Sequence, residues 1–257
     1  MNGNNRTRKH QWHRWALTTM LLCVIAYCVG TLWAMTKPYR QEAALRQTLQ
    51  TYAPEGSRTA ATAATSVHDQ RILDLQHRNR DALGWLIIAD TRIDYPFVQA
   101  TDNKRYLAID IDGQPAAAGT LFLDWQSRAD FQGFNHVIYG HSMKNGSMFG
   151  TLHKFGEPAH FEAHPTGSIH LADAAYQLEF FAYLDVDADD AMIYATHSMA
   201  PESRAELYDY VEARARHYRD IGLGPTDRIV TLSTCAYGTE NARIVLLGRL
   251  IRIVKGG

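Results

Sequence analysis

Cys235, Arg243 and His141 have the residue types and spacing of a nucleophilic catalytic site. Cys235 ends an apolar run, residues 229–234, and Arg243 opens another apolar run eight residues later. If these two runs pair as neighbouring strands, both side chains lie at one end of the sheet. His141 follows a third apolar run that ends at Tyr139. Functional side chains gathered at strand ends are typical of a catalytic site.

The chemistry of such a site follows from charge. A thiol attacks as the thiolate, and a nearby guanidinium and a protonated imidazole both favour that form. His141 could then protonate a leaving amine, and Arg243 could hold a developing oxyanion. The product is a thioester, which water would hydrolyse in a protease and an amine would attack in a transpeptidase. Each residue alone also fits a structural role: a buried cysteine, a surface histidine and a strand-edge arginine.

An uncharged stretch near the N-terminus, residues 15–36, predicts a membrane anchor. At about 1.5 Å per residue in a helix, its length matches the roughly 30 Å apolar core of a bilayer. Four basic residues and no acidic residue precede it in residues 1–14. We therefore predict a cytoplasmic basic tail, a single span of the cell membrane and an extracellular remainder. The alternatives are a cleaved signal peptide, which normally has a shorter apolar core, and a buried core helix.

The overall composition excludes several classes of protein. The chain has 257 residues, 46% of them hydrophobic and 21% charged, with a formal net charge of -1. A nucleic-acid-binding protein would normally carry a basic domain, so we expect no nucleic-acid partner. Three cysteines are too few for a disulfide scaffold, and Cys23 and Cys28 lie in the uncharged stretch. Cys235 is then an exported thiol with no cysteine to pair with in its own domain. We expect such a thiol either to be buried or to take part in chemistry.

The segment after the anchor is predicted to be a spacer, residues 37–66. Ala, Leu and Gln dominate its first half, which favours a helix, and Pro, Gly, Ser and Thr dominate its second half, which favours a flexible chain. The extracellular catalytic domain is predicted to be residues 67–257, opening with a helix over 67–82. Four apolar residues approximate one face of this helix: Val67, Ile72, Leu75 and Leu83.

Short apolar runs broken by turn-forming residues predict a mainly β domain. These runs are residues 84–99, 121–123, 136–139, 168–171, 176–184, 228–232 and 243–253. About eight strands at this spacing favour a sheet closed into a barrel or a sandwich. One helix is predicted among them over residues 201–220, where Leu207, Tyr210, Val211 and Tyr218 share a face and Pro201 lies in the first turn.

Four stretches between residues 67 and 254 resemble class B sortases, the membrane-anchored cysteine transpeptidases of Gram-positive bacteria. The stretches are residues 84–86 with 93–103, YGHSM at 139–143 with GSMF at 146–149, TLSTC at 231–235, and NAR at 241–243 with LGRL at 247–250. They resemble the opening strands, the histidine motif, the cysteine motif and the arginine strand of that family. Any one alone is weak, but together and in this order they are specific.

The resemblance implies a fold and a set of site residues. The fold is a closed eight-stranded sortase-type β-barrel with N-terminal helices and one long helix before the Cys-bearing strand. The implied catalytic residues are His141, Cys235 and Arg243. Ser233 and Thr234 are candidate substrate-binding residues, although strand packing explains Ser233 equally well. No cofactor and no metal site is implied.

The resemblance also implies a reaction and partners. Cys235 would attack the carbonyl after Thr in the C-terminal sorting motif of a surface protein and form a thioacyl-enzyme. An amine of a peptidoglycan precursor or of a pilin would then resolve it. Ser142 stands where the family often has Asn, which changes nothing in this scheme.

Three alternatives remain open at this point. An exported cysteine protease would only hydrolyse, although a papain-like enzyme places its cysteine before its histidine, the reverse of the order here. A metal-binding module could use four histidines with loose ligand-like spacing: His153, His160, His164 and His170. A structural wall-binding protein would carry an inactive site.

Overall fold

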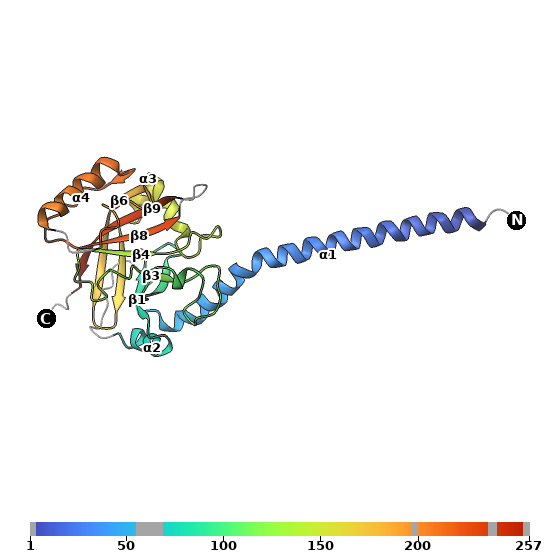
Figure 1. Ribbon diagram of the computed structural model, residues 1–257, viewed down its shortest axis with the longest axis horizontal. Coiled ribbons are helices and arrows are strands. Elements are labelled where there is room, and N and C mark those ends of the chain that lie inside the picture. The colour runs from blue at the N-terminus through green and yellow to red at the C-terminus, as the bar shows by residue number, and fades with distance from the viewer. Residues whose placement is uncertain (1–3, 55–68, 197–199, 236–240, 254–257) are drawn as a thin grey trace. The chain divides into compact units, whose positions relative to one another are not determined.

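In a computed structural model of the protein, eight strands form a closed β-barrel (Figure 1). The structure describes residues 4–54, 69–196, 200–235 and 241–253. The barrel strands are β1 (Ala82–Ile87), β2 (Asp94–Val98), β3 (Leu121–Leu123), β4 (Asn135–Tyr139), β5 (Thr166–Leu171), β6 (Ala175–Asp187), β8 (Ile229–Cys235) and β9 (Ala242–Arg252). Their order around the ring is β5-β1-β2-β3-β4-β8-β9-β6, and pairing of β6 with β5 closes it. The predicted closed eight-stranded barrel is confirmed, and a two-residue strand, β7 (His217–Tyr218), adds to β6 outside the ring.

Fully buried aromatic side chains fill the main core of this barrel. Phe97, Phe149, Phe155 and Phe180 have no exposed surface and belong to one apolar cluster. They come from β2, from β6 and from the segment after β4, which includes the 3₁₀-helix η3 (Gly150–Gly156). This packing fixes the strand ends that carry the candidate site, because close-packed side chains resist displacement.

The N-terminal helix α1 (Asn4–Leu49) is long and apolar enough to cross a membrane. Its mean hydropathy reaches 1.9 over a window in which no residue is buried by the rest of the protein. The chain divides into two compact units, Met1–Ala43 and Ala44–Gly257.

The second compact unit includes residues that the sequence assigned to the spacer. Leu49, at the end of α1, is 5% exposed, and Ala53, just after the 3₁₀-helix η1 (Gln50–Tyr52), is also buried. Both belong to an apolar cluster with Trp85 of β1. The compact unit extends from Ala44, and the boundary of the catalytic domain at residue 67 stays a prediction. The second half of the predicted spacer, from residue 55, lies outside the described residues.

A short helix, α2 (Gln70–Arg78), occupies part of the range predicted to be helical. Asp69 caps its N-terminus by accepting a hydrogen bond from the backbone N–H of Arg71 at 3.1 Å. Ile72 and Leu75 are fully buried, as the sequence pattern predicts. Leu83 instead lies on β1, and Val67 lies outside the described residues.

The late helix α4 (Pro201–Arg214) precedes the Cys-bearing strand, as predicted, but it ends earlier than residue 220. Leu207 and Val211 are fully buried on its inner face. The chain becomes extended at Ala215, because the backbone of β7 pairs with β6 and this pairing replaces the helical hydrogen bonds. Tyr218 is therefore a strand residue. A further helix, α3 (Pro158–Ala163), lies between η3 and β5.

Candidate active site

Strands β4 and β8 are parallel neighbours, and this pairing brings His141 and Cys235 to the same end of the barrel. Tyr139 of β4 is in register with Ser233 of β8. Beyond that pair, the backbone N–H of Gly140 donates to the carbonyl of Ser233 at 3.1 Å. His141 and Cys235 each lie two residues beyond this register pair, on adjacent chain segments.

Strand β9 brings Arg243 to the same place. Cys235 and Arg243 are directly opposite each other in the antiparallel pairing of β8 with β9. Opposite residues of antiparallel strands have Cα atoms roughly 4.5–5.5 Å apart. The backbone therefore gathers the three predicted catalytic residues at one edge, in the order β4, β8, β9, although the Cys235 side chain lies outside the described residues.

The imidazole of His141 is held by a backbone carbonyl from a distant segment. Its Nε2 lies 2.7 Å from the carbonyl oxygen of Leu107, the last residue of the 3₁₀-helix η2 (Arg105–Leu107). Because a carbonyl oxygen only accepts, Nε2 carries a proton and Nδ1 is left for proton exchange. The sequence did not reveal this support, since any residue type at 107 supplies a carbonyl.

Gly119 makes this support possible. Its φ is +58°, and a Cβ atom there would lie 2.5 Å from the carbonyl oxygen of Tyr106 and 3.2 Å from Cδ2 of His141. A glycine is needed here because its absent side chain leaves room for the carbonyls of η2 and the imidazole.

The Arg243 side chain is half-buried next to a tyrosine with a perturbed hydroxyl. Its Nη1 donates to the carbonyl of Ala242 at 3.1 Å. Burial, followed by the charge of Asp124, raises the pKa of Tyr139, and the positive charge of Arg243 acts in the opposite direction. The Tyr139 hydroxyl donates to Asp124 at 3.1 Å. The positive charge of Arg243 and the negative charge of Asp124 therefore act on the same tyrosine hydroxyl in opposite directions.

Ser233 and Thr234 are buried and bonded within the fold. Ser233 is 1% exposed, and its hydroxyl lies 2.9 Å from the Tyr194 hydroxyl. The Thr234 hydroxyl donates to the carbonyl of Gly140 at 2.7 Å. Both residues therefore have a structural role: Thr234 ties β8 to the segment carrying His141, and Ser233 ties β8 to the loop before α4. Contact of either with a substrate stays a prediction.

The four histidines considered as metal ligands are dispersed. His153 bonds the Ser142 hydroxyl at 2.8 Å, and His170 bonds Ser168 at 3.1 Å. The rings of His160 and His164 lie against each other with centroids 3.9 Å apart and planes tilted by 32°. Within the described part of the chain, no group of three or more His, Cys, Asp or Glu residues is placed to hold a metal ion.

The closed eight-stranded barrel with its additional strand and N-terminal helix matches the fold of the sortase class of proteins. The family model described as Sortase domain matches residues 86–251. The chain is also 36% identical over 201 residues to Sortase B of Listeria monocytogenes serovar 1/2a, covering 75% of this chain and 80% of that protein. The chain therefore belongs to the sortase family.

Solved structures agree with the class B resemblance. The crystal structure of sortase B from B. anthracis in complex with AAEK1 matches with a TM-score of 0.75 and 27% identity, covering 84% of this chain and 99% of that one. Clostridium perfringens sortase B matches with a TM-score of 0.66 and 30% identity, covering 70% and 98%. The resemblance to class B sortases is confirmed, and family membership implies a cysteine transpeptidase that acts on sorting signals.

Proposed function

We propose that this protein transfers surface proteins from their C-terminal sorting motif to an amine of a peptidoglycan precursor or a pilin. The observation that carries the proposal is the register of β4, β8 and β9, which gathers His141, Cys235 and Arg243 at one edge. The sortase relatives support the reaction class.

In the first half of the reaction, the Cys235 thiolate attacks the carbonyl carbon of Thr in the sorting motif, at the bond that is cleaved after Thr. The carbonyl π electrons move onto oxygen, and Arg243 donates hydrogen bonds to that oxyanion. When the C–N bond breaks, His141 gives a proton from Nδ1 to the leaving amine. Its other proton stays on Nε2, which continues to donate a hydrogen bond to the Leu107 carbonyl. The products are a thioester on Cys235 and the released C-terminal peptide.

In the second half, the acceptor amine attacks the thioester. His141, now neutral, takes a proton from the attacking nitrogen, and Arg243 again holds the oxyanion. The C–S bond breaks, the Cys235 thiolate leaves, and a new amide joins the surface protein to the acceptor. Water in place of the amine would give only hydrolysis.

The location of the enzyme follows from its charge pattern. The proposed arrangement is a cytoplasmic basic tail at residues 1–14, a membrane-spanning anchor at 15–36 and an extracellular catalytic domain. The basic residues upstream of the apolar stretch support this orientation. Such an anchor holds the enzyme where exported surface proteins and membrane-bound acceptors meet.

The test is product analysis with the full chain in detergent. A peptide that carries an NPQTN- or LPXTG-type motif is incubated with and without an amine acceptor, and the products are identified by mass spectrometry. We expect an amide-linked product with the wild type and none with Cys235→Ala. Cys28→Ala, which removes an exposed cysteine of α1, is the matched control and should keep full activity. Hydrolysis alone, at every acceptor concentration, would instead establish an exported protease.

A further inference from the structure

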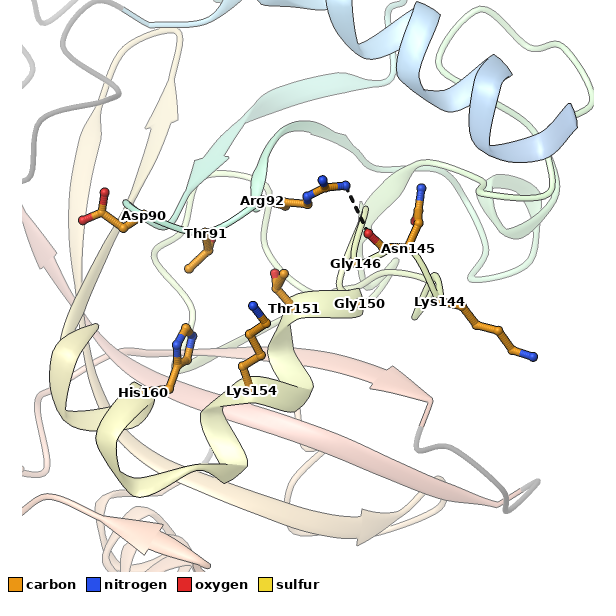
Figure 2. Close-up of a pocket in the computed structure, with 10 residues that line it drawn as sticks. All are labelled: Asp90, Thr91, Arg92, Lys144, Asn145, Gly146, Gly150, Thr151, Lys154 and His160. Atoms are coloured by element: carbon orange, nitrogen blue, oxygen red, sulfur yellow. Dashed lines mark hydrogen bonds between the residues drawn. The ribbon is translucent and has the colours of Figure 1, made fainter. Parts of the chain in front are cut away.

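A pocket of about 510 Å³ lies beside the segment that follows His141 (Figure 2). One wall is the turn between β1 and β2, residues 90–92, and the other is formed by residues 144–160. The second wall is joined to the catalytic histidine segment, because Ser142 bonds His153, the neighbour of Lys154. The pocket is separate from the strand ends that carry the proposed catalytic residues.

Two buried polar atoms in the pocket wall have no hydrogen-bond partner within the protein. They are Oγ1 of Thr151 and Nε2 of His160. Thr151 is only 6% exposed. Figure 2 shows the Lys154 ammonium group and the His160 ring reaching toward Thr91 and Thr151 across the pocket. Since native proteins pair almost all buried polar atoms, this cluster of donors indicates a ligand with several acceptor oxygens.

The pocket is electropositive. Arg92, Lys144 and Lys154 line it with a single carboxylate, Asp90, although Lys144 points away from the centre. Arg92 is fixed in the wall, because its Nη1 donates to the carbonyl of Asn145 at 3.1 Å. The three cations exceed the one acidic group by two charges, so the pocket matches a dianion.

The pKa of His160 is consistent with this positive charge. Its pKa is lowered first by burial and then by the positive charges of His164 and Lys154, against which Glu157 acts weakly. A neutral His160 at neutral pH adds a polar atom without adding charge. An anion in the pocket would favour the protonated form, which donates from Nε2.

We propose that this pocket binds a phosphoryl-bearing dianion, with a diphosphate as the best match. Thr91 lies on one wall, and Thr151, Lys154 and His160 come from successive turns of the other, so polar groups surround the pocket on more than one side. This arrangement suits the tetrahedral oxygens of phosphoryl groups better than a planar carboxylate. The volume holds a diphosphate together with part of the group that it links.

The chemical source of such a ligand rests on the proposed function. A membrane-bound peptidoglycan precursor carries its sugar on a lipid through a diphosphate, so the pocket would hold that linkage while the acceptor amine enters the active site. Arg46 of α1 donates to the carbonyl of Arg92 at 3.3 Å, and its guanidinium lies 4.9 Å from the Tyr95 ring centroid. In the sequence, Arg46 follows Met35, at the end of the apolar stretch, by only eleven positions, so a short segment of chain joins the predicted anchor to the pocket wall.

The test measures binding of inorganic pyrophosphate to the full chain in neutral detergent by isothermal titration calorimetry. Lys154→Ala should weaken binding at least about tenfold, and Thr151→Val, which removes the hydroxyl at nearly constant volume, about threefold or more. Thr151→Ser keeps the hydroxyl, and Arg252→Ala removes an exposed cation elsewhere. Both controls should bind within twofold of the wild type. Circular dichroism verifies that each variant is folded.

Three results would overturn the proposal. They are no saturable pyrophosphate binding by the wild type, equal binding by folded Lys154→Ala, and binding of succinate, a dicarboxylate, as tight as that of pyrophosphate. The NMR signal of His160 should shift toward the protonated form on titration, and binding should be tighter at pH 6 than at pH 8. Farnesyl diphosphate binding more tightly than pyrophosphate identifies a lipid-linked ligand, whereas equal binding identifies the free anion.

The proposal of an anion-binding pocket and the proposed function can be refuted independently. Lys154→Ala should leave transfer to a small soluble amine unchanged, because Lys154 has no part in the catalytic steps. Pyrophosphate binding by a wild type that ligates no peptide would remove the proposed function and keep the anion site. Ligation by a wild type that binds no pyrophosphate would do the reverse.

Discussion

Replacing Gly119 with alanine should lower both stability and turnover, because the new methyl group would strike the carbonyls that support His141. The left-handed φ of +58° costs a non-glycine residue about 1 kcal/mol. The added Cβ would lie 2.5 Å from the oxygen of Tyr106 and 3.0 Å from that of Leu107, and such overpacking costs about 1–3 kcal/mol. We therefore expect a loss of about 2–4 kcal/mol in the free energy of unfolding.

The same displacement acts on the chemistry. The Leu107 carbonyl holds Nε2 of His141 at 2.7 Å, and a shift of about 1 Å in a catalytic group can cost on the order of a hundredfold in rate. The kcat of peptide ligation by folded Gly119→Ala should fall by one to two orders of magnitude. Urea unfolding gives the stability, and ligation kinetics below the unfolding transition give kcat.

Gly113 provides the matched control. Its φ is +75°, but a Cβ atom there would meet nothing within 4 Å. Gly113→Ala therefore carries the backbone strain alone, about 1 kcal/mol, and should keep the wild-type kcat. Equal losses of stability in the two variants, or wild-type turnover in Gly119→Ala, would refute the proposed support of the imidazole.

Three further variants test the site, the domain boundary and a buried histidine. Arg243→Lys should keep its melting temperature but lose on the order of a hundredfold or more in kcat, because lysine lacks the planar fork; near-normal kinetics would exclude the oxyanion role. Leu49→Ala should destabilise the compact unit by about 2–5 kcal/mol in urea, whereas the exposed Leu32→Ala should not; an unchanged midpoint would mean that residues 44–54 are a free spacer. His136 has its pKa lowered to about 4, chiefly by burial. In the unfolded chain, His136 has a pKa of about 6.5, so below that pH the unfolded state binds more protons than the folded state. The free energy of unfolding should therefore fall by about 3 kcal/mol as the pH drops from about 6.5 to about 4. His136→Gln should flatten that fall in urea unfolding measured across this range, and an equally steep profile in the variant would assign it to other groups.

The strands were predictable because each is a short apolar run between turn formers. The seven runs correspond to all eight barrel strands, and the first contains both β1 and β2. The positions of His141, Cys235 and Arg243 on one edge also followed from the runs that precede or follow them. The end of the late helix did not, because Tyr218 continues the helical pattern and only its pairing with β6 makes it a strand residue.

Contacts made by the backbone, or between distant segments, were hidden from the sequence. The carbonyl of Leu107 supports His141 from 34 positions away in the sequence. Every residue type has a backbone carbonyl, so the identity of residue 107 gives no indication of this contact. Tyr194, which bonds Ser233, reaches β8 from the loop before α4, and no periodicity predicts where a loop returns. The burial of Leu49 was missed because the Pro, Gly, Ser and Thr that follow it suggested a free chain.

The place of β9 in the sheet has a consequence for biosynthesis. This last strand lies between β8 and β6, and it holds both neighbours along its length. Because β9 follows all seven other barrel strands in the sequence, a growing polypeptide cannot close the ring before residues 242–252 have been made. A chain interrupted before residue 242 would leave the facing edges of β8 and β6 unpaired, so we expect it not to form the closed barrel.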